Sequence, residues 1–170
     1  MMIDPSEIAS TEIPTTTPIA TPNPAAEAVV RASRQRTHVA QDDVSPTAFS
    51  RSNAARAPLA LEHAKLCAKI AADNKARDVL ILDLRGSTAV VDFFVVATAA
   101  SKRQSKALAI EIDMEMKKID EPKLSMELDE EGRWTLIDYG DFIVHVFSEQ
   151  ARVYYSIEDL WGDADRIAWD

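Results

Sequence analysis

The stretch W-T-L-I-D-Y-G-D-F-I-V-H-V-F, residues 134–147, predicts two strands joined by the tight turn Asp138–Asp141. Gly140 tolerates the positive φ that a tight turn requires, and aspartates readily bond nearby backbone N–H groups. The segment is therefore expected to form a β-hairpin, and the partners of its two strands must lie in the flanking sequence.

The two faces of this hairpin carry different side chains. Trp134 shares strand parity with Leu136 and Asp138, so these three side chains are expected on one face. Such a face, with Tyr139 nearby, is typical of protein interfaces, in which Trp and Tyr often act as anchors. The alternative is an ordinary turn beside a core tryptophan that lies under a helix. The other face is expected to be core, with Ile137, Ile143 and Phe147.

Two apolar runs upstream of the hairpin predict further strands. They are D-V-L-I-L-D-L, residues 78–84, and D-F-F-V-V-A-T, residues 92–98. Nearly continuous apolar runs of this length are typical of strands that are covered on both faces. A short edge strand is expected at residues 123–127, before a turn at 129–132. Together with the hairpin, these segments predict a five-stranded sheet.

One helix is predicted before these upstream strands in the sequence and another after them. Pro58 suits a first helical turn, and apolar residues then recur at helical spacing as far as Asn74. Ser101 followed by Gln104 is a capping box, so a helix should begin there and end near Asp120. The apolar side of this second helix is expected to include Ala107, Ile110 and Met114, flanked by Leu108 and Ile112.

The chain after the hairpin carries two weaker helix signals. Ser148 can cap a short helix that contains Arg152, Tyr154 and Tyr155, and S-I-E-D at 156–159 is a second capping signal. The aromatic residues there either pack on the sheet or, for Tyr155 with Arg152 at a spacing of three, face outward. Altogether the elements predict a mixed α/β fold, a five-stranded sheet packed with helices.

Composition divides the 170 residues unevenly. Residues 1–57 hold six of the eight prolines and no glycine, and they are predicted to form a disordered tail rich in Thr, Pro and Ala. Residues 58–170 hold all four glycines and every Trp and Tyr, and they are expected to form one domain.

Charge restricts the class of partner. The net charge is −9, and residues 58–170 carry 14 basic and 22 acidic residues. An acidic domain repels phosphate, so a sequence-independent grip on nucleic acid is not expected. It should attract a basic protein instead, more strongly at low salt. No apolar run approaches the roughly 20 residues that span a membrane.

The metal-binding residue types are scattered. His38, His63 and His145 lie in the predicted tail, a helix and a strand, without the spacing of a metal site. Because His145 alternates with Val144 and Val146, a structural role is expected for it, with a polar contact at a surface as the alternative. Cys67 is the only cysteine, and among the apolar residues of a predicted helix it is expected to be a buried, inert thiol. No metal or cofactor is therefore expected.

Catalytic motifs are equally sparse. The sequence contains neither a P-loop nor the G-x-S-x-G nucleophile elbow. Gly86-Ser87 after a strand faintly resembles the start of a nucleotidyltransferase site, which also needs paired acids on the next strand to hold Mg²⁺. Asp92 begins that strand, but Phe93 and Phe94 follow it, so the second ligand is missing. The protein is therefore not expected to be an enzyme.

Four segments together form a specific pattern. They are D-V-L-I-L-D-L-R-G-S (78–87), D-F-F-V-V-A-T-A-A-S-K-R-Q (92–104), the hairpin (134–147) and R-V-Y-Y-S-I-E-D-L-W-G-D-A (152–164). In their order and spacing they resemble the ribosomal silencing factors, also called Iojap-like proteins. The resemblance covers about residues 59–168. One departure is Ala99, where the family often has Gly.

The resemblance implies a nucleotidyltransferase-like fold without the catalytic acids. It also implies binding to large ribosomal subunit protein fourteen, where the small subunit would join, so that translation falls when nutrients are scarce. The implied partner-binding surface is Trp134 with the turn Asp138, Tyr139, Gly140 and Asp141, and Arg152 and Tyr155 are further candidates. Family members are often dimers when free.

Two other functions stay open at the level of the sequence. One is a large-subunit assembly factor, the role of organelle relatives, and the other is a degenerate metal-dependent nucleotidyltransferase. The expected setting is a bacterial cytoplasm. An organelle is the alternative, because Ala, Arg and Ser in residues 25–57 resemble a transit peptide, although acids such as Asp4, Glu7, Glu12, Asp42 and Asp43 argue against one.

Overall fold

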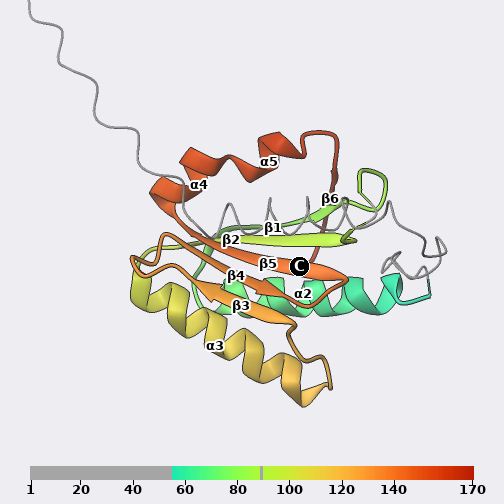
Figure 1. The fold of residues 1–170 in the computed structure, drawn as a ribbon, viewed down its shortest axis with the longest axis horizontal. Coiled ribbons are helices and arrows are strands. Elements are labelled where there is room, and N and C mark those ends of the chain that lie inside the picture. Colours follow the sequence, from blue (N-terminus) through green and yellow to red (C-terminus); the bar gives the residue numbers. More distant parts are fainter. Residues whose placement is uncertain (1–54, 89) are drawn as a thin grey trace, which may run out of the picture.

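The computed structural model describes residues 55–88 and 90–170. The predicted tail, residues 1–57, lies almost wholly outside the described residues, as does His38. Within them the elements follow the order α2-β1-β2-α3-β3-β4-β5-α4-α5-β6 (Figure 1). The predicted order of helices and strands is confirmed, with one strand added at the end.

One mixed sheet holds the fold together, with the strand order β3-β4-β5-β2-β1-β6. The central pair β2 and β5 is parallel, and the other neighbouring pairs are antiparallel. The strands are β1 (Arg77–Asp83), β2 (Phe93–Ala99), β3 (Ser125–Leu128), β4 (Trp134–Asp138), β5 (Phe142–Ser148) and β6 (Asp165–Ile167).

The sheet therefore has six strands, one more than the sequence predicts. β6 pairs antiparallel with β1, with Ile167 opposite Ile81. Its three residues, Asp-Arg-Ile, are too few to show the alternation that identifies a strand. The pairing with β1, rather than local sequence, defines this strand.

Helices cover both faces of the sheet (Figure 1). The long helices α2 (Ala57–Asp73) and α3 (Lys102–Lys118) pack on one face, and the short helices α4 (Glu149–Tyr155) and α5 (Ile157–Leu160) pack on the other. β2, in the middle, is buried along its whole length, as its apolar sequence predicts.

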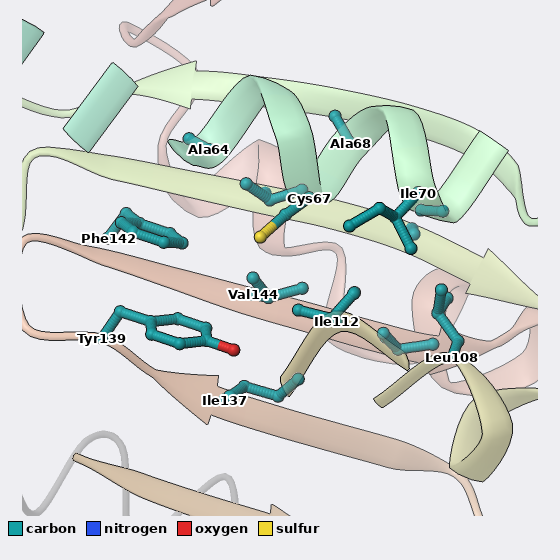
Figure 2. Packing of buried hydrophobic residues seen from close by; sticks show 14 of the residues in the cluster. Ala64, Cys67, Ala68, Ile70, Leu108, Ile112, Ile137, Tyr139, Phe142 and Val144 are labelled. Atoms are coloured by element: carbon teal, nitrogen blue, oxygen red, sulfur yellow. The ribbon is translucent and has the colours of Figure 1, made fainter. Parts of the chain in front are cut away.

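The larger core lies between the sheet and the two long helices. Figure 2 shows Cys67 of α2 pointing toward the sheet, with Ile112 of α3 and Val144 of β5 close by. The predicted burial of Cys67 is confirmed, since its side chain is fully enclosed and burial raises the pKa of its thiol. Deprotonation at neutral pH is thereby suppressed.

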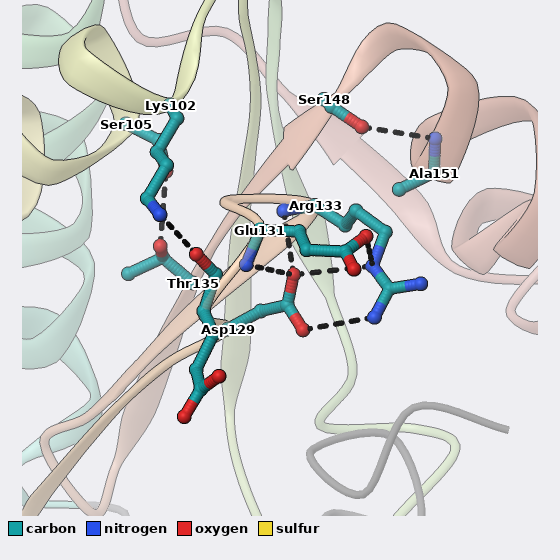
Figure 3. Close-up of polar contacts among 9 residues, drawn as sticks. Lys102, Ser105, Asp129, Glu131, Arg133, Thr135, Ser148 and Ala151 are labelled. Atoms are coloured by element: carbon teal, nitrogen blue, oxygen red, sulfur yellow. Dashed lines mark hydrogen bonds and ion pairs between the residues drawn. The ribbon is translucent and has the colours of Figure 1, made fainter.

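Two of the predicted helix caps form. The Ser101 hydroxyl accepts a hydrogen bond from Gln104 N at 3.2 Å, and the Gln104 side chain accepts one from Ala100 N at 2.7 Å. Ser148 likewise accepts from Ala151 N at 3.2 Å (Figure 3). Ser156 does not cap α5 through its side chain, which donates to Val153 O at 2.8 Å instead.

The predicted orientation of α3 is wrong at the centre of its expected apolar side, although the flanking Leu108 and Ile112 are buried as expected. Ile110 and Met114 are 48% and 55% exposed, and Ala107 is exposed too. The buried side of the helix is Ser105, Leu108, Ala109, Ile112, Asp113 and Met116. The helix thus has two apolar stripes. Because the buried stripe also contains the polar residues Ser105 and Asp113, the exposed stripe was the more apolar of the two and was predicted to be the core face.

The assignment of faces in the hairpin also needs correction. Trp134 lies directly opposite Phe147 in the β4–β5 register, so both side chains are on one face of the sheet. Ile143 belongs to that same core, and only Ile137 lies on the other side. All three residues that were expected to be core are buried, but two of them share the face of Trp134.

Candidate partner-binding site

The turn between β4 and β5 has the geometry that its sequence predicts. Gly140 has φ +91°, a conformation that side chains disfavour, and its N–H donates to Asp138 Oδ1 at 2.7 Å. The turn is tied to its surroundings, because Asp141 O accepts from Asp92 N at 2.8 Å and the Asp141 carboxylate pairs with Arg56 at 3.1 Å. These bonds give the loop a fixed shape.

Tyr139 does not project from this turn. It is 4% exposed, and its ring stacks on Phe142 at 4.8 Å, within the core that faces α2 and α3 (Figure 2). Its buried hydroxyl has no hydrogen-bond partner among the residues described, and burial is the main cause that raises the pKa of the phenol. Tyr139 therefore lies on the side of the sheet opposite Trp134.

Trp134 is buried beneath α4. Its side chain is 4% exposed, and its ring lies 4.8 Å from Phe147 and 4.9 Å from Tyr155 of the helix. The indole Nε1–H donates to Nδ1 of His145 at 3.1 Å across the strands. This is the arrangement of the structural alternative, a core aromatic under a helix, so the ring supports α4 from below.

His145 is enclosed in the same aromatic cluster. It is fully buried, and its ring meets the ring of Phe94 edge-on at 4.6 Å. Burial, assisted by the charge of Arg152, lowers the pKa of His145 to about 3. The imidazole is thus neutral at physiological pH, and Nδ1 must be the unprotonated nitrogen because it accepts the tryptophan N–H. This explains the predicted structural role of His145.

Arg152 joins four parts of the fold. Its guanidinium donates to Glu158 at 2.8 Å, to the Thr98 hydroxyl at 3.3 Å and to Asp78 O at 3.1 Å. Only about 10% of its side chain is exposed. Burial raises the pKa of Glu158, but the hydrogen bonds from Arg152 outweigh this and leave that pKa below its usual value. Arg152 therefore fixes α4 and α5 to β1 and β2.

The structure brings three of the seven predicted site residues together, namely Trp134, Arg152 and Tyr155. All three lie on the α4 side of the sheet, where Tyr155 is half-buried between Trp134 and Tyr154. The turn residues lie at the end of the hairpin, and Tyr139 faces the other core. The predicted residues thus do not form one exposed surface.

Other residues of α4 and α5 are the exposed ones. Val153 and Leu160 are each 75% exposed and Tyr154 is 63% exposed. The sequence does not reveal this, because α4 is only seven residues long and has no clear periodicity. The spacing of three from Arg152 to Tyr155 could have indicated a common face, but that face turns toward the sheet.

Acidic side chains dominate this part of the chain. Residues 149–165 contain five acids, Glu149, Glu158, Asp159, Asp163 and Asp165, and a single base, Arg152. Asp159 and Asp163 are exposed, whereas Glu158 is held by Arg152. Glu149 is paired with Arg77, and exposed Arg166 follows the segment, so the acidic character of the surface over α4 and α5 comes mainly from Asp159 and Asp163.

A separate open cavity of about 470 Å³ lies between the start of α3 and the β3–β4 loop. Its base holds the buried hydroxyls of Ser105 and Thr135, hydrogen-bonded at 2.9 Å (Figure 3). Two lysines and two acids line it, Lys102, Lys106, Asp129 and Glu130. Of these, Asp129 is paired with Arg133 at 3.2 Å.

The region that resembles a nucleotidyltransferase site holds one acid. Asp92 is fully buried at the start of β2, and neither carboxylate oxygen has a hydrogen-bond partner within the described ranges. In residues 55–88 and 90–170, no three His, Cys, Asp or Glu side chains are grouped so that they could hold a metal ion. In the same ranges, no helix has the length and hydrophobicity to cross a membrane.

The fold and the site define a mixed α/β domain with helices on both faces of its sheet and an acidic, partly apolar helical surface. Residues 57–170 match the family described as "ribosomal silencing factor during starvation". The chain belongs to this family, and the resemblance of the four sequence segments is confirmed.

Similar proteins include bacterial and plant members. The chain is 40% identical to the ribosomal silencing factor of Bacillus subtilis over 59% of this chain and 85% of that protein. It is 34% identical to the chloroplastic Iojap protein of Arabidopsis thaliana, over 74% of this chain and about half of that longer protein. The bacterial relative is named as a silencing factor, which is a regulatory role.

Solved structures of similar proteins share the fold. A protein from Chromobacterium violaceum superposes with a TM-score of 0.58 at 38% identity, over 60% of this chain and 85% of the other. A protein from Bacillus halodurans gives 0.54 at 32% identity, over 65% of this chain and 98% of the other. The mixed α/β fold is therefore shared by solved members of this group.

Proposed function

We propose that this protein is a ribosomal silencing factor that binds large ribosomal subunit protein fourteen and thereby blocks joining of the small subunit. The observation that carries the proposal is the family match over residues 57–170. The mechanism is steric, because a bound protein on the joining surface excludes the small subunit and no bond is made or broken. Translation falls under nutrient limitation as a result.

The charge of the folded part supports a protein partner. Residues 58–170 carry eight more acidic than basic residues, a balance that suits a basic ribosomal protein and disfavours capture by bare rRNA. The proposed site is built around Trp134, the turn Asp138–Asp141, Arg152 and Tyr155, with Trp134 as a buried support of that site. Because three of these residues lie on the α4 side of the sheet, that side is the favoured one. The proposed setting is a bacterial cytoplasm.

The decisive experiment is a subunit-joining assay. Purified mature small and large subunits are mixed in Mg²⁺ with and without the full chain, and the products are separated on a sucrose gradient. The proposal predicts that the joined-ribosome peak is lost when the protein is present. Normal joining would contradict silencing and leave the role in large-subunit assembly that the sequence keeps open.

Catalysis is tested separately. The proposal expects no transfer from labelled nucleoside triphosphates in Mg²⁺, because Asp92 lacks the second acid of a two-metal site. Robust transfer that is abolished by Asp92→Asn would overturn the steric mechanism in favour of an enzyme.

A further inference from the structure

The large hydrophobic side chains with the greatest exposure, among the residues that the structure describes, all lie on α4 and α5. Val153 and Leu160 are 75% exposed and Tyr154 is 63% exposed, whereas Met114 and Leu124, the next in rank, reach 55%. Figure 1 shows both short helices on the side of the sheet away from α2 and α3. Apolar residues gathered on one short segment mark an interaction surface more strongly than scattered ones do.

The base of this segment is rigid, so its exposed side chains are held in place. Ala151 is buried against the sheet, Tyr155 rests on Trp134 at 4.9 Å, and Arg152 bonds to Glu158 of α5. Ser156 links the two helices and has φ 39° and ψ 52°. This left-handed conformation costs free energy for residues other than glycine. Such backbone strain, held by surrounding contacts, is common at binding sites.

The charges around these apolar residues select the chemistry of the partner. Asp159 and Asp163 are exposed beside Leu160, while Glu158 is paired with Arg152, Glu149 is paired with Arg77, and exposed Arg166 follows the segment. A surface with apolar and aromatic side chains inside an acidic rim fits a basic protein surface with an apolar centre.

We propose that the outer face of α4 and α5, formed by Val153, Tyr154, Leu160, Asp159 and Asp163, is the contact surface for the basic ribosomal protein. This inference rests on the proposed function and specifies its docking site. Trp134, Arg152 and Tyr155 then act as positioning residues, because they hold the two helices from beneath rather than contact the partner.

The acidic rim argues against two other occupants of the face. RNA would bring phosphates next to Asp159 and Asp163, and a second copy of this chain would bring the same acids together. Both arrangements place like charges side by side, which costs free energy unless the salt concentration is high.

The test compares variants of the α4–α5 face with a matched control on α3. Val153→Ser with Leu160→Ser removes the apolar contacts, and Asp159→Lys with Asp163→Lys reverses the rim charge. Ile110→Ser with Met114→Ser makes the same kind of change on the opposite side of the sheet, at 48% and 55% exposure. The full chain is titrated against purified large subunits and against isolated large-subunit protein fourteen.

Each α4–α5 variant should weaken binding to both probes at least about tenfold, whereas the α3 control should stay within about twofold of the unmodified chain. Unchanged thermal unfolding of all variants excludes misfolding as the cause. If both α4–α5 variants bind as tightly as the unmodified chain, this face is excluded as the docking site, but the proposed function stands. If the unmodified chain binds neither probe, the docking site and the proposed function are both refuted.

Two further outcomes would overturn the inference by identifying a different occupant. One is that the α4–α5 variants lose affinity for protein-free rRNA but not for the isolated protein. The other is that they only convert a dimer into a monomer in sedimentation velocity, with affinity for the large subunit unchanged.

Discussion

Buried His145 is bonded to Trp134, whose ring contacts Tyr155 of α4, so these single residues connect the sheet to the helix. The His145 Nδ1 accepts the Trp134 indole N–H, and the histidine ring packs against Phe94. The sequence predicts a structural role for this histidine, but it could not predict the cross-strand bond, which depends on the β4–β5 register and on the helix that covers both rings. The same cover explains why Trp134 is core and not an exposed anchor.

His145 should make stability depend on pH. Its pKa is about 3 in the folded chain and roughly 6.5 when unfolded, so between these values only the unfolded state binds the proton. The contribution of His145 to the free energy of unfolding should therefore fall by about 1.4 kcal/mol for each pH unit between pH 6.5 and about pH 3. Urea denaturation at several pH values measures this slope.

His145→Gln is the matched control, since the glutamine carbonyl can still accept the Trp134 N–H but does not titrate. The slope between pH 6 and pH 4 should be shallower in this variant by about the amount that one proton contributes. Carboxylates with lowered pKa values contribute equally to both proteins. Equal slopes would mean that His145 is not buried in its neutral form.

Gly132 is a second residue with a clear mechanical role. It has φ +72° in the β3–β4 loop, and a Cβ there would lie 2.6 Å from the Cβ of Lys102 and 2.8 Å from its Cα. Figure 3 shows Lys102 above this loop, where its ammonium donates to Glu130 O. Strain and backbone collision together should make Gly132→Ala cost about 2 kcal/mol or more.

Gly86→Ala is the comparison for this prediction, because a Cβ at Gly86 would meet nothing within 4 Å. It should change the free energy of unfolding by less than about 0.5 kcal/mol. Equal effects of the two substitutions in chemical denaturation would contradict the described approach of Lys102 to the loop.

Elements that depend on packing or pairing with distant segments were the hardest to predict from sequence. Strong signals located α2, β1, β2, α3 and the hairpin, because apolar runs, caps and a Gly turn coincide there. β6 is defined by pairing with β1 alone. On α3, the stripe with Ile110 and Met114 competes with the buried one, and only packing against the sheet selects between them. The short helix α4 likewise takes its orientation from Arg152 and Tyr155.

Loss of the Arg152 side chain, which bonds to Glu158, Thr98 and Asp78, should loosen α4 and α5 together. Arg152→Ala leaves the Glu158 carboxylate, with 21% side-chain exposure, without its main partner and breaks the bonds to Thr98 and Asp78. The free energy of unfolding should fall by about 2 kcal/mol, and amide exchange should accelerate in residues 149–160.

An exposed ion pair provides the control for Arg152. Arg77 and Glu149 are 3.0 Å apart, with side chains 52% and 71% exposed, so Arg77→Ala should cost less than about 1 kcal/mol. Glu158→Gln in the Arg152→Ala background should recover part of the loss, because the unpaired charge is removed. If Arg152→Ala and Arg77→Ala lower the free energy of unfolding equally, Arg152 does not hold α4 and α5 to the sheet.

Charge and shape act together on the scale of the whole molecule. The folded part is acidic, and its exposed apolar side chains on α4 and α5 lie on the face opposite the two long helices (Figure 1). The sequence predicts the sign of this charge and a basic protein partner. It does not predict where the contact lies, because a net charge does not show which surface carries the charged residues. The location depends on which side chains the sheet buries.

Steric silencing by occupancy is tested most directly by joining kinetics. Light scattering is followed after small subunits are added to large subunits that have been incubated with increasing amounts of the full chain. The fraction that joins should fall in proportion to the fraction of large subunits occupied, with half inhibition at the dissociation constant from direct titration. Joining at the normal rate and to the normal extent, with large subunits saturated by the protein, would contradict the steric mechanism.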